Sequence, residues 1–324
     1  MRLERALAEW KGTEAALCFS SGYAAALGTI PALVSKSDVV LLDKLCHASL
    51  IDAAKLSGAI LRVFPHNNLR KLESHLEWAR REHAGKRVLI VTESVFSMDG
   101  DRAPLHELVE LKKRFDALLM LDEAHAVGVI GLHGRGLAAE ENLSDNVDVQ
   151  MGTMSKALGA MGGYICGSHD LIEWLINRAR SFIYSTASPP AIAAAASAAI
   201  DFLSSQEGEE RRLLLWKRIQ LMQELLQSLD VGRWALDVGM LAANAQRPTL
   251  NAQRSKHPRA RSFRCSSATS RRRSIWPLHS KAKASSSQQF VIRPSPRLPR
   301  VCALPSLHHT KKIKSERSVK QLND

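Results

Sequence analysis

The stretch Gly152-Thr153-Met154-Ser155-Lys156-Ala157-Leu158-Gly159 places a single lysine among small residues. It follows VDVQM (residues 147–151), whose alternation of apolar and polar residues predicts a β-strand. A lysine at a strand end can lose solvent, which favours the neutral amine that imine formation needs. On this stretch alone an ordinary turn with a solvated lysine is the alternative, so the choice depends on the rest of the chain.

Apolar segments of strand length recur along the first two-thirds of the sequence. Predicted strands cover residues 39–43, 61–64, 87–92, 117–121, 147–151 and 162–167. Predicted helices cover residues 1–16, 24–33, 50–57, 69–82, 105–115, 169–180, 190–203 and 209–229. Strands that alternate with helices in this way indicate an α/β fold, a mostly parallel sheet covered by helices on both faces.

Ligands of such sheets bind beyond the carboxyl ends of the strands. Polar residues of different strands are expected to meet at that edge, namely Ser97, Asp122, His125, Thr153 and Lys156. Their shared location is a stronger argument for a site than any of the motifs singly.

These residue types suit pyridoxal phosphate, which needs an amine, an acid beside its pyridine nitrogen, an anion site and a group stacked on its ring. Lys156 supplies the amine, and Asp122 could keep the pyridine nitrogen protonated. His125 could bond to the phenolic oxygen, and His47 could stack on the ring. The alternatives are an aspartate that caps the loop after its strand and, for His47, a satisfied loop histidine.

A turn of small residues, Ser20 to Tyr23, precedes an alanine-rich helix. The start of a helix presents free N–H groups and a positive dipole end to an anion. This turn, with Thr153 and Ser155, could therefore contact a phosphate group. A plain N-cap by Ser20 or Ser21 is the alternative.

Charge is unevenly distributed along the 324 residues. The net charge is +13, but residues 233–324 hold 20 of the 45 Lys and Arg and 3 of the 32 Asp and Glu, so the first 232 residues carry −4. This acidic body gives no electrostatic reason to expect nucleic acid. No apolar run is long enough to cross a membrane, and the start is not a signal peptide. Five scattered cysteines fit reduced thiols in a cytoplasmic protein.

Six strings of the first 230 residues or so resemble the α-oxoamine synthases, which are pyridoxal-phosphate enzymes of the fold-type I aminotransferase class. The strings are FSSGYAAALG, DKLCHASLIDAAKLSGA, TESVFSMDGDRAPL, LMLDEAHAVGVIGLHGRG, GTMSKALGAMGGYICG and FIYSTASPP. Within the family, HASLIDAAKLSGA, PHNNL and the stretch from FSMDGD to DEAH most resemble the biotin-pathway member. The resemblance implies the large domain of these transferases, with a sheet of seven strands.

The resemblance also implies a set of site residues. Lys156, His47 and Asp122 would be catalytic, with Lys156 forming the imine with the cofactor. The cofactor-binding residues would be Gly22, Tyr23, His47, Ser97, Asp122, His125, Thr153, Lys156 and Thr186. Thr186 would reach the phosphate of the partner subunit, because these enzymes are homodimers with sites at the interface. No metal is implied.

The implied reaction condenses L-alanine with a pimeloyl thioester, of coenzyme A or of an acyl carrier protein, and releases carbon dioxide. Another α-oxoamine synthase activity, of the 2-amino-3-ketobutyrate type, is an alternative. A further alternative is a non-catalytic remnant that acts through a basic, nucleic-acid-binding tail.

The predicted organisation divides the chain into three segments. Residues 1–205 form the cofactor-binding large domain, without the N-terminal segment of the family; residues 206–232 form a connecting helix; and residues 233–324 form a basic Arg/Ser/Pro-rich tail without a recognisable fold. We favour a reading-frame shift near residue 235 as the source of this tail. A disordered basic tail and a divergent small domain are the alternatives.

Overall fold

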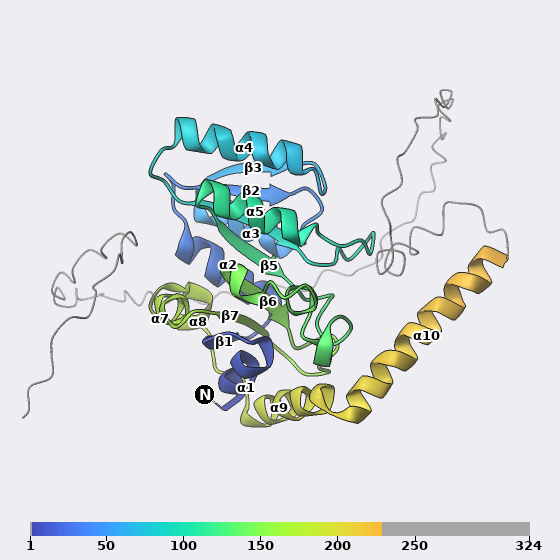
Figure 1. Cartoon of the computed structure of the whole chain (residues 1–324). Helices are drawn as coiled ribbons and strands as arrows, with labels where there is room; N and C mark the ends of the chain where they lie inside the picture. The colour runs from blue at the N-terminus through green and yellow to red at the C-terminus, as the bar shows by residue number, and fades with distance from the viewer. Residues whose placement is uncertain (1, 229–324) are drawn as a thin grey trace, which may run out of the picture. The chain divides into compact units, whose positions relative to one another are not determined.

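The structure is a computed structural model that describes residues 2–228. These residues form a seven-stranded sheet with the strand order β1-β7-β6-β5-β4-β2-β3 (Figure 1). Its strands are β1 (Ala15–Phe19), β2 (Val39–Asp43), β3 (Ile60–Phe64), β4 (Val88–Glu93), β5 (Leu118–Asp122), β6 (Val149–Thr153) and β7 (Gly163–Gly167). The pairs among β2 to β6 are parallel, and β7 is antiparallel to both neighbours. The predicted seven-stranded, mostly parallel α/β sheet is confirmed.

Helices cover both faces of this sheet. Figure 1 shows α4 and α5 on one face, and α2 and α3 on the other. The helices are α1 (Arg2–Lys11), α2 (Gly22–Leu33), α3 (Ala48–Ser57), α4 (Leu69–Glu82), α5 (Leu105–Phe115), α6 (Leu137–Glu140), α7 (His169–Arg178), α8 (Arg180–Ile183), α9 (Pro190–Ser204) and α10 (Gln206–Ser228). Two short 3-10 helices, η1 (Leu132–Gly134) and η2 (Ser144–Asn146), lie between β5 and β6.

Strand β2 shows why an unbroken apolar run forms a central strand here. Its side chains alternate between the faces, so Val40 and Leu42 join the core under α2 and α3, whereas Val39 and Leu41 join the core under α4 and α5. All four are fully buried. A parallel strand between two helical layers needs apolar residues on both faces, which removes the alternation of a half-exposed strand.

The predicted helix at residues 1–16 is wrong in its second half. Helix α1 ends at Lys11, and Gly12 follows with a φ of +69°, a conformation that favours glycine. Residues 15–19 instead form β1, which pairs antiparallel with β7 from Ala15↔Gly167 to Phe19↔Gly163. The segment AALCF has no polar alternation and contains good helix formers, so only its pairing with β7 identifies it as a strand.

The carboxyl ends of the central strands are aligned. Glu93 ends β4 and pairs in register with Asp122, which ends β5 and pairs with Met151 of β6. The connections from β2 and β4 lead to helices on opposite faces, α3 and α5. A crevice therefore lies beyond these strand ends, at the place where open parallel sheets bind their ligands.

Several predictions concern regions that the structure leaves untested. The domain boundaries at residues 205 and 232 stay predictions, and the basic tail at residues 233–324 lies outside the described residues.

In residues 2–228 no helix is both long and apolar enough to cross a membrane. The cysteines within this range, Cys18, Cys46 and Cys166, are unpaired.

Candidate active site

A cleft of about 210 Å³ opens at the carboxyl ends of β4, β5 and β6. It contains seven of the nine predicted cofactor-binding residues: Gly22, Tyr23, His47, Asp122, His125, Thr153 and Lys156. The other lining residues are Ser21, Ser49, Glu93, Ala124, Met151 and Ser155. Residues from five separate stretches of the sequence thus share one site.

The other two predicted residues do not line this cleft. Ser97 lies in the loop after β4 with an exposed side chain, and Thr186 is exposed between α8 and α9. Their roles stay predictions, and for Thr186 the predicted contact belongs to another subunit.

Lys156 lies on the turn that follows β6. The turn is closed by backbone hydrogen bonds from Gly159 N to Lys156 O (3.0 Å) and from Ala160 N to Met154 O (2.9 Å). The lysine itself is exposed, and its amine makes no hydrogen bond or ion pair with any residue of the range 2–228. The expected loss of solvent is therefore not seen, but the amine is free to react at the mouth of the cleft.

Asp122 is the last residue of β5 and is 5% exposed. Its Oδ1 accepts a hydrogen bond from Ala124 N (2.9 Å), so it does cap the following loop. Burial raises the pKa of Asp122, while the charges of Lys156 and His47 act in the opposite direction. Its Oδ2 has no hydrogen-bond partner within the described stretch of the chain, and the cleft gives it room to meet a cationic ring nitrogen.

The two histidines of the cleft are held in different ways. Burial, and then the charges of Lys156 and His47, lower the pKa of His125, which favours the neutral ring. His47 caps the N-terminus of α3, and its Nδ1 accepts from Ser49 N (3.2 Å) beside Ser49 Oγ (2.8 Å). Because Nδ1 is an acceptor, the proton of a neutral His47 ring lies on Nε2. His47 is thus both a satisfied loop residue and a cleft residue.

The predicted anion site lies where α2 begins. Ser21 is the N-cap and accepts from Ala24 N (3.0 Å), which confirms the capping role. The N–H groups of Gly22 and Tyr23 belong to the first turn, which has no intrahelical acceptors. A side-chain carbon on Gly22 would lie 3.5 Å from Thr153 Cβ, so the helix start and the end of β6 are close neighbours. Capping and anion binding are therefore compatible here.

Glu93 is a cleft residue that the sequence analysis missed. It is 2% exposed and accepts a hydrogen bond from His47 N. Burial, and then the charge of Asp122, raise the pKa of Glu93 to about 8. The signal that could have found it is its position directly after the predicted strand at residues 87–92, which matches that of Asp122 after residues 117–121.

A buried ion pair lies behind the cleft. Lys11 of α1 is 1% exposed and pairs with the fully buried Glu123, and it also donates to Arg135 O. Glu123 accepts from Ala138 N (3.0 Å) as well. A buried pair of this kind persists only when its remaining hydrogen-bonding capacity is used. It ties the first helix to the loop that begins at Asp122.

The fold and the cleft define a class of protein: an α/β protein of the transferase type, with a lysine, a buried acid and a helix N-terminus around one site. The profile of the aminotransferase class I and II family matches residues 1–258. The chain belongs to that family, and the predicted resemblance is confirmed.

Relatives and solved structures of this family extend the comparison. The chain is 52% identical over 227 residues to the 8-amino-7-oxononanoate synthase of Geobacter sulfurreducens, which covers 70% of this chain and 57% of that protein. A serine palmitoyltransferase from S. paucimobilis with a bound PLP–myriocin aldimine superposes with a TM-score of 0.67 at 34% identity, over 71% of this chain and 56% of that one. The 8-amino-7-oxononanoate synthase of Francisella tularensis gives a TM-score of 0.63 at 33% identity, over 73% and 67%. The chain thus spans little more than half the length of the curated relatives it matches.

Proposed function

We propose that the cleft binds pyridoxal phosphate and that the protein is an α-oxoamine synthase, which makes 8-amino-7-oxononanoate from L-alanine and a pimeloyl thioester. The observation that carries this proposal is the meeting of Lys156, Asp122, His47 and the start of α2 in one cleft. The 52% identity to a named 8-amino-7-oxononanoate synthase supports the choice of substrates. Membership of the family and the PLP-containing neighbour support the cofactor.

The residues present fit this cofactor. The unpaired oxygen of Asp122 is a partner for the pyridine nitrogen, and the neutral ring of His125 can bond to the phenolic oxygen. The N–H groups of Gly22 and Tyr23 would hold the phosphate, together with the Thr153 hydroxyl. Lys156 would hold the cofactor covalently through its free amine.

When bound, pyridoxal phosphate supplies an electron sink for negative charge at the α-carbon of an amino acid. Asp122 would keep the pyridine nitrogen protonated, which would strengthen that sink. Lys156 Nζ would accept the α-proton and later return one. His47 would cover the ring, with the proton of its neutral imidazole on Nε2.

The overall reaction replaces the carboxylate of alanine with the acyl group of the thioester. A carbon–carbon bond forms between the α-carbon and the acyl carbon, the thiolate leaves, and carbon dioxide is released. The carrier thiol is that of coenzyme A or of an acyl carrier protein. We place this chemistry in the cytoplasm and in a homodimer, where Thr186 would contact the phosphate in the partner subunit.

Two measurements on the full chain test this proposal. Titration with pyridoxal phosphate is expected to give a visible absorbance band that Lys156→Ala lacks. Pimeloyl-CoA is then expected to release free coenzyme A only when L-alanine is present. If folded, cofactor-loaded protein releases no coenzyme A, the activity assignment fails, and the non-catalytic remnant becomes the better interpretation.

The second candidate is another activity of the same family. It is favoured by the structural match to a serine palmitoyltransferase at a TM-score of 0.67. A panel of alanine, glycine and serine, each with pimeloyl-CoA, acetyl-CoA and palmitoyl-CoA, separates the possibilities. Glycine with acetyl-CoA tests the 2-amino-3-ketobutyrate type, and serine with palmitoyl-CoA tests the palmitoyltransferase type.

A further inference from the structure

Asp43, the last residue of β2, accepts hydrogen bonds from two loops, the one after β2 and the one after β3. This fully buried residue accepts a hydrogen bond on Oδ1 from Leu45 N (2.9 Å) and on Oδ2 from Asn67 N (2.8 Å). The first bond fixes the turn that leads to His47, and the second fixes the loop after β3. One carboxylate therefore ties the segment before His47 to a neighbouring loop.

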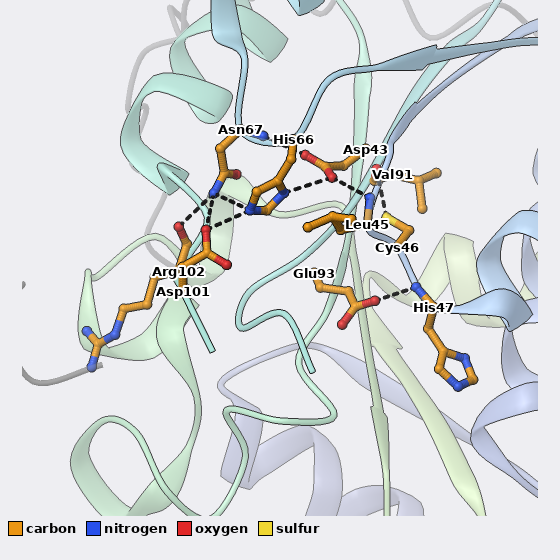
Figure 2. A network of polar contacts seen from close by, with 10 residues as sticks. All are labelled: Asp43, Leu45, Cys46, His47, His66, Asn67, Val91, Glu93, Asp101 and Arg102. Carbon is orange, nitrogen blue, oxygen red and sulfur yellow. Dashed lines mark hydrogen bonds and ion pairs between the residues drawn. The ribbon is translucent and has the colours of Figure 1, made fainter. Parts of the chain in front are cut away.

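His66 lies between two carboxylates beside this turn (Figure 2). Its Nδ1 is 3.0 Å from Asp43 Oδ1, and its Nε2 is 2.7 Å from Asp101 Oδ2. An ionised carboxylate can only accept hydrogen bonds, so the imidazolium is the form of the ring that donates to both carboxylates. Asn67 Nδ2 lies 3.3 Å from His66 Nε2, farther away than Asp101 Oδ2. Asn67 Nδ2 also donates to Asp101 Oδ2 (2.8 Å). We call Asp43, His66, Asn67 and Asp101 the His66 clamp.

Residues 45–47 connect the His66 clamp directly to the cleft. After Leu45, the Cys46 thiol donates to Val91 O of β4 (3.6 Å), and His47 N donates to Glu93. Figure 2 shows the His47 ring pointing away from the clamp, and this ring lines the cleft. Two carboxylates at the ends of adjacent strands, Asp43 and Glu93, thus hold the turn from both sides.

We propose that His66 is a positioning residue for His47: as an imidazolium between Asp43 and Asp101 it fixes the turn at residues 44–47, and with it the place of the His47 ring. The significance of that ring for catalysis rests on the proposed function. The tie between His66 and His47 rests on the contacts alone.

The charges around His66 support its cationic form. Burial by itself would lower the pKa of His66, but its hydrogen bonds to Asp43 and Asp101, and their charges, outweigh burial and raise it. The neighbouring cations are directed elsewhere: Lys44 is exposed, and the Arg102 guanidinium pairs with Glu140. On its remaining side His66 meets the ring of Phe96 edge-on, with centroids 4.3 Å apart.

A metal ion is the other explanation for such a cluster. Ligand atoms of His66, Asp99 and Asp101 lie within 4.8 Å of one another. Both ring nitrogens of His66, however, already face carboxylates at hydrogen-bond distance. A ligand nitrogen needs a free lone pair, which an imidazolium lacks, so a cation is not required to explain the arrangement.

The test uses the full chain with isotope-labelled histidine, followed by NMR without cofactor. His66→Gln leaves a neutral side chain whose single nitrogen cannot occupy the positions of both ring nitrogens. We expect the ring signals of His47 to shift in this variant, whereas the matched control His83→Gln leaves them unchanged. His83 is the C-cap of α4 and packs against Trp78. Unchanged His47 signals in folded His66→Gln would overturn the proposal.

A second variant provides a test if His66→Gln does not fold. Asp101→Asn keeps an acceptor for His66 Nε2 but removes one negative charge, so His66 is expected to lose its proton at a lower pH than in the wild type. The His47 signals are expected to move at that same lower pH. If His66 titrates and His47 does not follow, the positioning role fails. A shift of the His66 signals on adding Zn²⁺ or Mg²⁺ to the wild type would also overturn it.

Cofactor-loaded protein gives an independent readout. The visible circular dichroism of bound pyridoxal phosphate is expected to weaken in His66→Gln and to persist in His83→Gln, with kcat falling by up to about a hundredfold, as misplacement by an ångström can cause. If the protein binds no cofactor but His47 still follows His66, the proposed function fails and the positioning role stands. If coenzyme A is released but the His47 signals do not follow the titration of His66, the positioning role fails and the proposed function stands.

Discussion

Two groups of charged side chains lie next to each other at the carboxyl edge of the sheet, and they are arranged in opposite ways. In the His66 clamp the cation lies between two anions, and Asn67 Nδ2 donates to one of them, Asp101. In the cleft Lys156 has no partner among residues 2–228, Asp122 uses one oxygen, and Glu93 has a raised pKa. Pairing stabilises the fold, whereas groups left unpaired retain the capacity to bind and react.

The largest expected effect tests whether the cleft is reactive. Lys156→Ala removes the free amine, so we expect the visible cofactor band to be lost and coenzyme A release to fall by about 10²–10⁴-fold, the range for a general acid–base group. Absorbance titration and a thiol assay measure both. Lys55→Ala, an exposed lysine of α3, is the control and keeps both signals. A normal band in Lys156→Ala would contradict the site.

A matched pair of substitutions compares how the His66 clamp and the cleft contribute to the free energy of unfolding. Asp43 and Asp122 are buried aspartates that end β2 and β5. Asp43→Asn leaves the His66 imidazolium with one anion fewer, so the free energy of unfolding is expected to fall by about 2 kcal/mol. Asp122→Asn removes a charge that burial disfavours and keeps the bond to Ala124, so cofactor-free protein is expected to gain up to about 1 kcal/mol.

Chemical unfolding of the two variants measures this difference, and the same variants are assayed for cofactor binding. Asp122→Asn is expected to weaken the cofactor signal despite its gain in stability. Equal losses of stability in both variants would mean that the cleft is as fully paired as the clamp.

The pH dependence of the free energy of unfolding tests the raised pKa of Glu93. Its pKa rises from 4.5 to about 8 on folding, so between these values the folded state keeps a proton that the unfolded state has lost. Glu93 therefore makes its full contribution to the free energy of unfolding below about pH 4.5. This contribution is lost as the pH rises toward about 8, by at most about 1.4 kcal/mol per pH unit. Unfolding of wild type and Glu93→Gln across this range shows the difference, and parallel curves would contradict it.

The smallest effect concerns Tyr164 of β7. It is fully buried, and its hydroxyl has no hydrogen-bond partner in the described structure. Tyr164→Phe removes an unsatisfied polar group, and we expect the free energy of unfolding to rise by about 1 kcal/mol. Thermal or chemical unfolding measures this change. A loss of stability would show that the hydroxyl has a partner after all.

The site was predictable where local pattern and strand ends coincide. Asp122 and Lys156 follow recognisable strands, so their meeting at one edge follows from the parallel topology. Glu93 satisfies the same rule but was overlooked because nothing in its own sequence context marks it as reactive. The clamp was not predictable, since PHNNL and MDGD give no sign that His66 and Asp101 lie 2.7 Å apart.

The sequence by itself determined the family, the mostly parallel sheet and the positions of its central strands along the chain, because buried parallel strands are continuous apolar runs and the motif strings are specific. Tertiary structure decided the rest. It made residues 15–19 a strand by pairing them with β7, it buried Glu93 beside Asp122 and so raised its pKa, and it placed His66 between two anions. Each of these depends on contacts between distant segments of the chain, and local sequence carries no record of a partner's position.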